Sequence, residues 1–217
     1  MVIAMDGPAG SGKSTIAKLL AEKLKGQNGK EYTYINSGNL YRTITLGCIR
    51  AKIDIKDSEK VIEFAKNINI SYKKTQVFLN GEDVTPLLHT DEIDRFSAPL
   101  SAIVPVRHIV NDLIRNIAKG QNIVIEGRDM TTVVFPDAEY RFYLDASADS
   151  RAKRRFEQGV SNLTLPEIKD AILQRDEIDR NKTEGSLKIA DGVTYLDTSD
   201  LTIIQVYEKL IDVITNN

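Results

Sequence analysis

Gly7-Pro8-Ala9-Gly10-Ser11-Gly12-Lys13-Ser14 is the stretch that decides the fold of this chain. It matches the pattern G-x-x-x-x-G-K-[ST], in which the backbone N–H groups of a glycine-rich turn point at phosphate oxygens. The short apolar run of residues 2–5 precedes it, and residues 14–25 show helical spacing after it. The loop therefore joins a strand to the positive end of a helix. We predict that residues 7–15, ending at Thr15, bind a nucleoside triphosphate.

Two side chains of this loop carry chemistry. Lys13 can reach the β- and γ-phosphates as a point charge, and Ser14 can offer its hydroxyl to Mg²⁺. ATP and Mg²⁺ are the expected cofactors. Loops of this kind serve kinases, GTPases and motor proteins, so the motif alone does not name a reaction.

The rest of the chain alternates strand and helix. Strands are predicted at 32–35, 122–126, 140–144 and 193–196, and helices at 40–51, 58–67, 105–118, 148–155, 164–181 and 202–214. This alternation predicts an α/β fold of the P-loop NTPase type, a parallel sheet flanked by helices. Ligands of such folds bind at the carboxyl ends of the strands.

Residues 68–88 break the alternation. Residues 69–72 and 76–79 have strand character, and the pair Asn80-Gly81 predicts a turn before residues 82–84. We interpret this region as a small antiparallel subdomain inserted into an otherwise single domain of residues 1–217.

Composition excludes several protein classes. The 217 residues include 29 basic and 31 acidic side chains, a net charge of −2, and 41% of residues are hydrophobic. Such a chain is not disordered, and a near-neutral acidic surface is a poor nonspecific nucleic-acid binder. No apolar run approaches the ~18 residues of a membrane span. A single cysteine, Cys48, excludes an internal disulfide. We expect a cytoplasmic protein with no nucleic-acid or membrane partner.

Arginines at strand ends and on one helix form the second functional signal. Arg42 follows the second strand, Arg128 follows the strand at 122–126, and Arg175 lies four residues before Asp179 on one helix face. Arginine binds phosphate through two hydrogen bonds and stays charged. Together with a P-loop, these residues predict a second substrate that carries its own phosphate.

With these motifs assembled, the chain resembles the bacterial-type cytidylate kinases, the CMP and dCMP kinases among the nucleoside monophosphate (NMP) kinases. The residues that carry the resemblance span almost the whole chain in the family's order: 6–14, 37–42, 106–107, 126–138, 151–155, 175–180 and 196–199. The stretch 127–138 is more specific than the P-loop. The resemblance implies phosphorylation of CMP and dCMP by ATP, in a protein that we expect to be a monomer.

The resemblance also implies roles for individual residues. Cytosine would be contacted by Ser37, Arg107 and Asp129, the acceptor phosphate by Arg42 and Arg128, and the sugar by Asp179 and Arg175, with Tyr41 among the substrate-binding residues. The inserted region would bind the acceptor. A short lid at about 151–162 would supply Arg154 and Arg155, which with Lys13 and Arg128 form the expected catalytic set.

The chain departs from the family pattern at several positions. Asn36 stands in place of Asp, Thr131 in place of Gly, Ala98 in place of a base-contacting Ser, and Lys182 in place of Arg. Two other functions are compatible with the P-loop: a P-loop kinase with a different small acceptor, and a noncatalytic nucleotide sensor. A P-loop kinase that phosphorylates an alcohol would need a general base near the hydroxyl, and the sequence offers no clear candidate for one.

Overall fold

The structure is a computed structural model that describes residues 1–159 and 163–216. The chain forms two compact units. The P-loop unit consists of Met1–Lys30 and Val124–Asn217, and the central unit consists of Glu31–Ile123.

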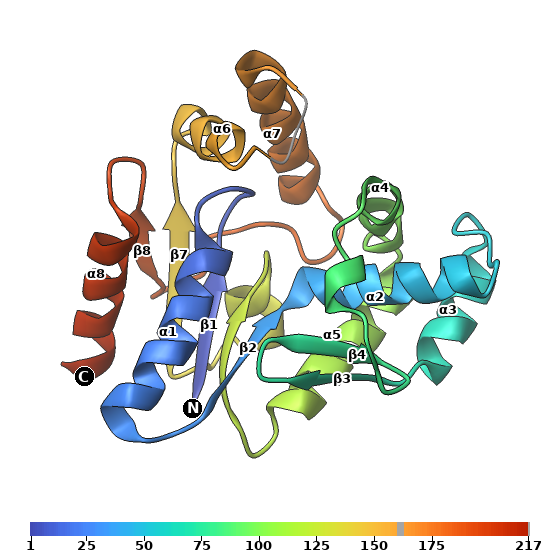
Figure 1. The fold of residues 1–217 in the computed structure, drawn as a ribbon, viewed down its shortest axis with the longest axis horizontal. Coiled ribbons are helices and arrows are strands. Elements are labelled where there is room, and N and C mark those ends of the chain that lie inside the picture. The colour runs from blue at the N-terminus through green and yellow to red at the C-terminus, as the bar shows by residue number, and fades with distance from the viewer. Residues whose placement is uncertain (160–162, 217) are drawn as a thin grey trace. The chain divides into compact units, whose positions relative to one another are not determined.

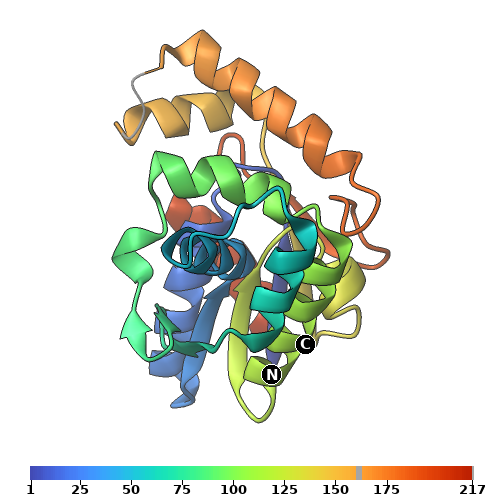
Figure 2. The same cartoon turned by 90° about the vertical axis from the view of Figure 1, so that its right-hand side faces the viewer.

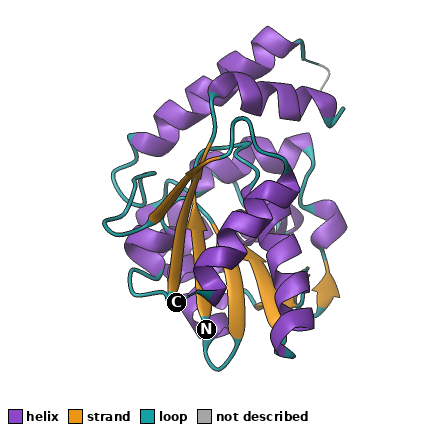
Figure 3. Cartoon of the chain, turned by 90° about the vertical axis from the view of Figure 1, so that its left-hand side faces the viewer, coloured by secondary structure: helices purple, strands orange, loops and turns teal. Residues whose placement is uncertain are grey.

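The larger of two sheets has the strand order β2-β6-β1-β7-β8. Its strands are β1 (Val2–Asp6), β2 (Tyr32–Asn36), β6 (Asn122–Glu126), β7 (Tyr140–Asp145) and β8 (Thr194–Asp197). β7 pairs in parallel with β1 and with β8, and the N–H of Gly127 donates to the carbonyl of Met5 just after β6. The parallel α/β sheet expected from the sequence is confirmed, and its strands are drawn in orange in Figure 3.

Four α-helices and one short π-helix are described in the P-loop unit: α1 (Lys13–Asn28), η2 (Met130–Val134), α6 (Ala148–Glu157), α7 (Leu165–Arg180) and α8 (Ile203–Thr215). α1 packs against β1 and α8, and Figure 1 shows α1 and α8 beside β1, β7 and β8. The predicted start of α7 is confirmed, because Thr164 and Glu167 form a reciprocal capping box.

Helices α6 and α7 lie side by side (Figure 2). They share a small apolar core of Ala152, Ile168 and Ile172. An ion pair is buried in the same interface, where Nη2 of Arg151 lies 2.7 Å from Oδ2 of Asp176. Removal of one partner of such a buried ion pair lowers the free energy of unfolding by about 3–5 kcal/mol. The pair therefore holds α6 firmly against α7.

The central unit contains the second sheet and the remaining helices: β3 (Ile70–Lys73), β4 (Gln76–Leu79), β5 (Glu82–Asp83), η1 (Thr85–Leu87), α2 (Ser37–Arg50), α3 (Ser58–Asn67), α4 (Asp91–Leu100) and α5 (Val104–Ala118). The strands pair antiparallel in the order β3-β4-β5, which confirms the antiparallel patch predicted within 68–88. Val77 and Leu79 turn inward from β4 and are buried.

Two features of the central unit differ from the sequence-based prediction. α2 begins at Ser37, not near residue 40, so Ser37 and Tyr41 both lie on the helix. α4 was not predicted at all. Its N-cap Thr90 accepts a hydrogen bond from the N–H of Ile93, while Pro99, a residue that argues against helix, lies inside its last turn.

Within the described residues, no helix combines the length and the apolar character needed to cross a membrane.

Candidate functional site

The P-loop adopts a backbone that side chains would prevent. Gly7 has φ +147°, and a Cβ placed there would lie 2.0 Å from the carbonyl oxygen of Leu144 at the end of β7. Gly10 has φ +80°, and its Cβ would lie 3.2 Å from Cβ of Arg151. Both glycines are thus required for the loop to curl between β1 and α1.

Lys13 opens α1 and folds back over the loop. Its Nζ donates to the carbonyl of Pro8 at 2.7 Å and lies 3.3 Å from Oγ of Ser11, and the side chain is 4% exposed. Burial, with a smaller contribution from Arg128, lowers the pKa of Lys13 to about 7, against the opposing effect of Glu126, Asp6 and Asp179. Phosphate oxygens beside this ammonium would favour its charged form.

Ser14 and Thr15 follow on the first turn of α1, and both are exposed. Within the described residues, no group of three His, Cys, Asp or Glu side chains could hold a metal ion. Mg²⁺ bound with a nucleotide needs no such group, because it keeps several waters and takes oxygens from the phosphates. The accessible Ser14 hydroxyl at the P-loop fits this mode of binding.

Thr198, in the segment after β8, contacts the P-loop. Its Oγ1 lies 3.2 Å from the carbonyl oxygen of Ser11, and its N–H donates to the carbonyl of Asp145 at 2.8 Å. Arg154 is bound at the same place, since its Nη1 lies 3.2 Å from Oγ1 of Thr198 and its Nη2 donates to the Thr198 carbonyl. Thr198 belongs to a stretch that the sequence marked without a role, and the structure gives it one.

The other lid arginines differ sharply from Arg154. Arg155 is exposed. Arg151 is buried, forms an ion pair with Asp176, and donates from Nη1 to the carbonyl of Ala9 at 3.1 Å. Arg151 therefore links the P-loop to α6 and α7. Of the lid expected at about 151–162, residues 160–162 lie outside the described residues.

The buried carboxylate of Asp179 forms ion pairs with three basic side chains. Nε of Arg128 lies 2.7 Å and Nε of Arg175 3.3 Å from Oδ2, and Nζ of Lys182 lies 2.9 Å from Oδ1. Burial alone would raise the pKa of Asp179, but the three cations outweigh it and hold this pKa below its usual range. Arg128, Arg175 and Asp179, three of the predicted site residues, thus lie in contact. Lys182, noted only as a departure from a family pattern, is a member of the same cluster.

We expect Asp179→Asn to lower the free energy of unfolding by about 2 kcal/mol at pH 7, because three cations lose their shared anion while keeping access to water. The folded-state pKa lies below the unfolded value of about 3.9. The contribution of the carboxylate is therefore complete at neutral pH, begins to fall as pH drops through the unfolded-state value, and is lost at the folded-state value, so it is partly reduced at pH 3.5. Urea unfolding at pH 7 and pH 3.5 measures this.

Asp170→Asn is the matched control, since Asp170 is exposed on the same helix α7. A loss of stability for Asp179→Asn no larger than that of the control, or a loss that grows at acid pH, contradicts the role assigned to the cluster.

The central unit carries the remaining predicted residues. Ser37 and Tyr41 are buried on α2, and the guanidinium of Arg107 on α5 lies 5.9 Å from the centre of the Tyr41 ring. Arg107 is itself buried and donates from Nη1 to the carbonyl of Ser101 at 3.1 Å. Tyr41 and Arg107, 66 positions apart in the sequence, are thus neighbours within the central unit.

Arg42 lies one residue further along α2 and is more accessible. Its Nε donates to Oδ1 of Asp94 on α4 at 2.9 Å. Asp94 was missed because α4 was not predicted, and no local pattern marks it. The carbonyl of Ala98, one of the positions expected to depart from the family pattern, accepts a hydrogen bond from Oγ of Ser101 at 2.8 Å.

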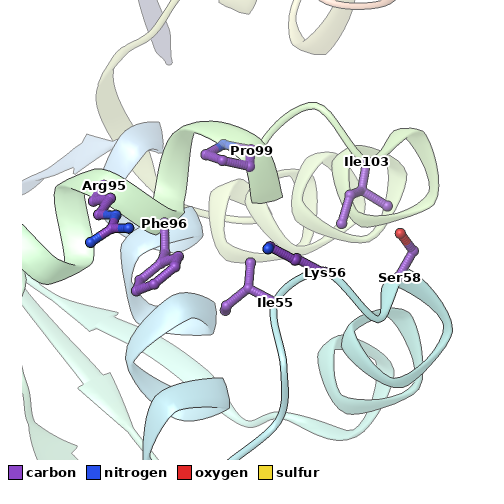
Figure 4. Close-up of a pocket in the computed structure, with 7 residues that line it drawn as sticks. All are labelled: Ile55, Lys56, Ser58, Arg95, Phe96, Pro99 and Ile103. Atoms are coloured by element: carbon purple, nitrogen blue, oxygen red, sulfur yellow. The ribbon is translucent and has the colours of Figure 1, made fainter.

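A pocket of about 490 Å³ also opens in the central unit (Figure 4). It is lined by Ile55, Lys56, Ser58, Arg95, Phe96, Pro99 and Ile103. None of these is a predicted site residue. The residues with a chemical rationale lie elsewhere, in two groups: Lys13, Arg128, Asp129, Arg154, Arg155, Arg175 and Asp179 in the P-loop unit, and Ser37, Tyr41, Arg42 and Arg107 in the central unit.

Comparison with solved structures places the fold. An uncharacterized protein from Eubacterium ventriosum superimposes with a TM-score of 0.56 at 14% identity, covering 100% of this chain and 99% of that one. Shikimate kinase from Bacteroides thetaiotaomicron gives 0.51 at 14% identity, covering 99% and 98% of the two chains. These likenesses concern the fold alone.

Comparison of sequences is more specific. The chain is 41% identical to a cytidylate kinase of Caldanaerobacter subterraneus, over 99% of this chain and 95% of that protein. It is 36% identical to a cytidylate kinase of Clostridioides difficile, over 97% and 96% of the two chains. The family model described as cytidylate kinase matches residues 3–216. The chain therefore belongs to the cytidylate kinase family.

Proposed function

We propose that the protein transfers the γ-phosphoryl group of ATP to CMP and dCMP, giving ADP and CDP or dCDP. The family match over residues 3–216 carries this proposal. It is supported by the P-loop with its buried Lys13 and by the cluster of Arg128, Arg175 and Lys182 on Asp179.

The donor is assigned to the P-loop unit. The backbone N–H groups of residues 7–15, other than Pro8, which has none, surround the phosphates, and Lys13 supplies a positive charge to the β- and γ-phosphoryl oxygens. Ser14 would hold Mg²⁺, which when bound neutralises charge on those oxygens. The interactions of Lys13 with Pro8 and Ser11 give way to contacts with phosphate, which is the stronger acceptor.

The acceptor roles are assigned residue by residue. Arg42 and Arg128 bind the phosphate of the nucleotide, and Asp179 with Arg175 binds its sugar. Ser37, Arg107 and Asp129 read cytosine, with Tyr41 supporting Arg107. A carboxylate suits this reading, because it accepts from the exocyclic amine of cytosine, a group that uracil lacks.

The transfer needs no general base in this scheme. The attacking oxygen belongs to an acceptor phosphate whose second pKa is about 6, so it is largely ionised at neutral pH. Catalysis consists of positioning and charge neutralisation by Lys13, Arg128 and the lid arginines Arg154 and Arg155. Arg154 must exchange its contact with Thr198 for a phosphoryl oxygen in order to act directly.

Two regions take roles in this proposal. Residues 68–88, which contain β3, β4 and β5, form the NMP-binding insert, and the lid expected at about 151–162, of which residues 151–159 are described, excludes water from the transfer. We further propose a monomer that acts in the cytoplasm. Cys48, the sole cysteine of the sequence, is buried, which disfavours a disulfide-linked dimer.

The experiment that tests the function is ADP release from MgATP with CMP, dCMP, UMP, dTMP or AMP offered separately. Turnover with CMP and dCMP well above that with UMP is the expected result. Turnover with only another nucleotide would keep a P-loop kinase and replace the acceptor. Binding of ATP without turnover of any acceptor would favour a nucleotide sensor.

A further inference from the structure

Asp6 ends β1 directly before the P-loop and is fully buried. Its carboxylate accepts three hydrogen bonds from the segment after β6. The N–H of Met130 donates to Oδ1 at 2.9 Å, the N–H of Thr131 donates to Oδ2 at 2.7 Å, and the Thr131 hydroxyl donates to the same oxygen at 2.6 Å.

These bonds restrain a short and functionally important turn. Gly127 is tied to β1 by its N–H, which donates to the carbonyl of Met5 at 2.9 Å, and Met130 and Thr131 are tied to the next residue of β1, Asp6. Only Arg128 and Asp129 lie between the two attachments. After Asp129 the chain continues into η2, whose first turn closes on the Asp129 carbonyl through the N–H groups of Val133 and Val134.

The bonds also leave Asp6 little capacity for other chemistry. A buried carboxylate that accepts three donors has few free lone-pair sites, which makes it a poor general base or metal ligand. Burial, with a smaller contribution from the charge of Asp129, raises the pKa of Asp6 to about 6, a value that the three hydrogen bonds already hold down. The Thr131 hydroxyl therefore supports a charge that the interior disfavours.

We propose that Asp6 and the Thr131 hydroxyl form a clamp that positions Arg128 and Asp129 for the acceptor nucleotide. Both are positioning residues and need not touch substrate. This inference rests on the proposed function, in which Arg128 binds the acceptor phosphate and Asp129 reads the base. Glycine could supply the backbone N–H at position 131 but not the hydroxyl, so the third bond of the clamp is specific to a hydroxyl-bearing residue.

Thr131→Val removes the hydroxyl and preserves shape and backbone N–H. It should raise KM for CMP about tenfold, in line with loss of a hydrogen bond to a charged group, and leave KM for ATP within about twofold. Thr131→Ser retains the hydroxyl and should restore KM for CMP to near the wild-type value. The preference for CMP over UMP should change little, since Asp129 keeps its carboxylate.

Thr132→Val is the matched control. Thr132 is the next residue of η2, and its Oγ1 is buried with no hydrogen-bond partner among the described residues. A Thr131→Val variant that behaves like Thr132→Val overturns the clamp, as does an equal rise in KM for ATP and CMP. If Thr131→Val does not fold, Thr131→Ala is compared with Thr131→Ser under the same criteria.

A second readout does not depend on activity. Titration of the Asp6 carboxyl carbon by NMR should show a higher pKa in Thr131→Val than in wild type, and an unchanged value in Thr132→Val. Wild-type protein that fails to phosphorylate CMP refutes the proposed function, whereas an Asp6 pKa unaffected by Thr131→Val refutes the clamp itself. The two failures are therefore distinguishable.

Discussion

Lys13→Ala is expected to lower kcat for phosphoryl transfer about a thousandfold while the protein stays folded. The ammonium is the charge that the P-loop itself supplies to the transferred group, and loss of one such electrostatic contact costs about 10²–10³-fold in rate. The lysine is buried and its pKa is lowered to about 7, so its removal relieves the cost of a buried charge. ADP release from MgATP and CMP measures the effect, and circular dichroism checks the fold.

Lys23→Ala is the control for this substitution, because Lys23 is exposed on the same helix α1. It should retain wild-type turnover. Calorimetry with ATP separates the two contributions of Lys13: we expect weaker ATP binding as well as slower transfer. Turnover by Lys13→Ala within a few-fold of wild type would exclude the assigned role of the P-loop lysine.

Features written in consecutive residues could be predicted from the sequence. The P-loop is one, since its glycines and Lys13 lie within eight positions. The capping box of Thr164 and Glu167 is another, because its two halves are three residues apart. Buried strands such as β6 also stand out as short apolar runs. In each case the pattern and the interaction that it encodes occupy the same stretch of chain.

Interactions between distant residues could not be predicted. The Thr131 hydroxyl meets Asp6 across 125 positions, and Thr198 meets Ser11 across 187. A threonine in isolation predicts only a cap, a turn or a strand position, and nothing local says which carboxylate or carbonyl it will meet. The departure from the family pattern was therefore visible at Thr131, while its partner Asp6 became visible only in the fold.

Helix α4 was missed by the sequence-based prediction for a different reason. Its ten residues include Pro99 and a mixture of charged and apolar side chains, and its local propensity is weak. It is stabilised instead by the cap at Thr90 and by packing against α2. Asp94, the partner of Arg42, was missed along with it. The Thr90 cap is a local signal that the prediction overlooked, whereas the contacts of α4 with α2 and of Asp94 with Arg42 are tertiary and are not displayed by the sequence.

Asp129→Ala is the substitution expected to change substrate choice most. The carboxylate attracts the exocyclic amine of cytosine and repels O4 of uracil, so its removal takes away both effects. The ratio of kcat/KM for CMP to that for UMP should fall about a hundredfold, mainly through loss of activity on CMP. Steady-state rates with both nucleotides measure the ratio. Asp137→Ala, at an exposed carboxylate beyond η2, should leave it unchanged.

Asp129→Asn and Thr131→Val together distinguish direct recognition of the base by Asp129 from the positioning of Asp129 by the clamp. The amide can donate to O4 of uracil, so Asp129→Asn should move the preference further toward UMP than Asp129→Ala does. Thr131→Val displaces an intact carboxylate, so it should weaken CMP and UMP by similar factors. If instead Thr131→Val changed the ratio and Asp129→Ala did not, base selection would lie with Ser37 and Arg107 in the central unit, and Asp129 would serve only to shape the turn.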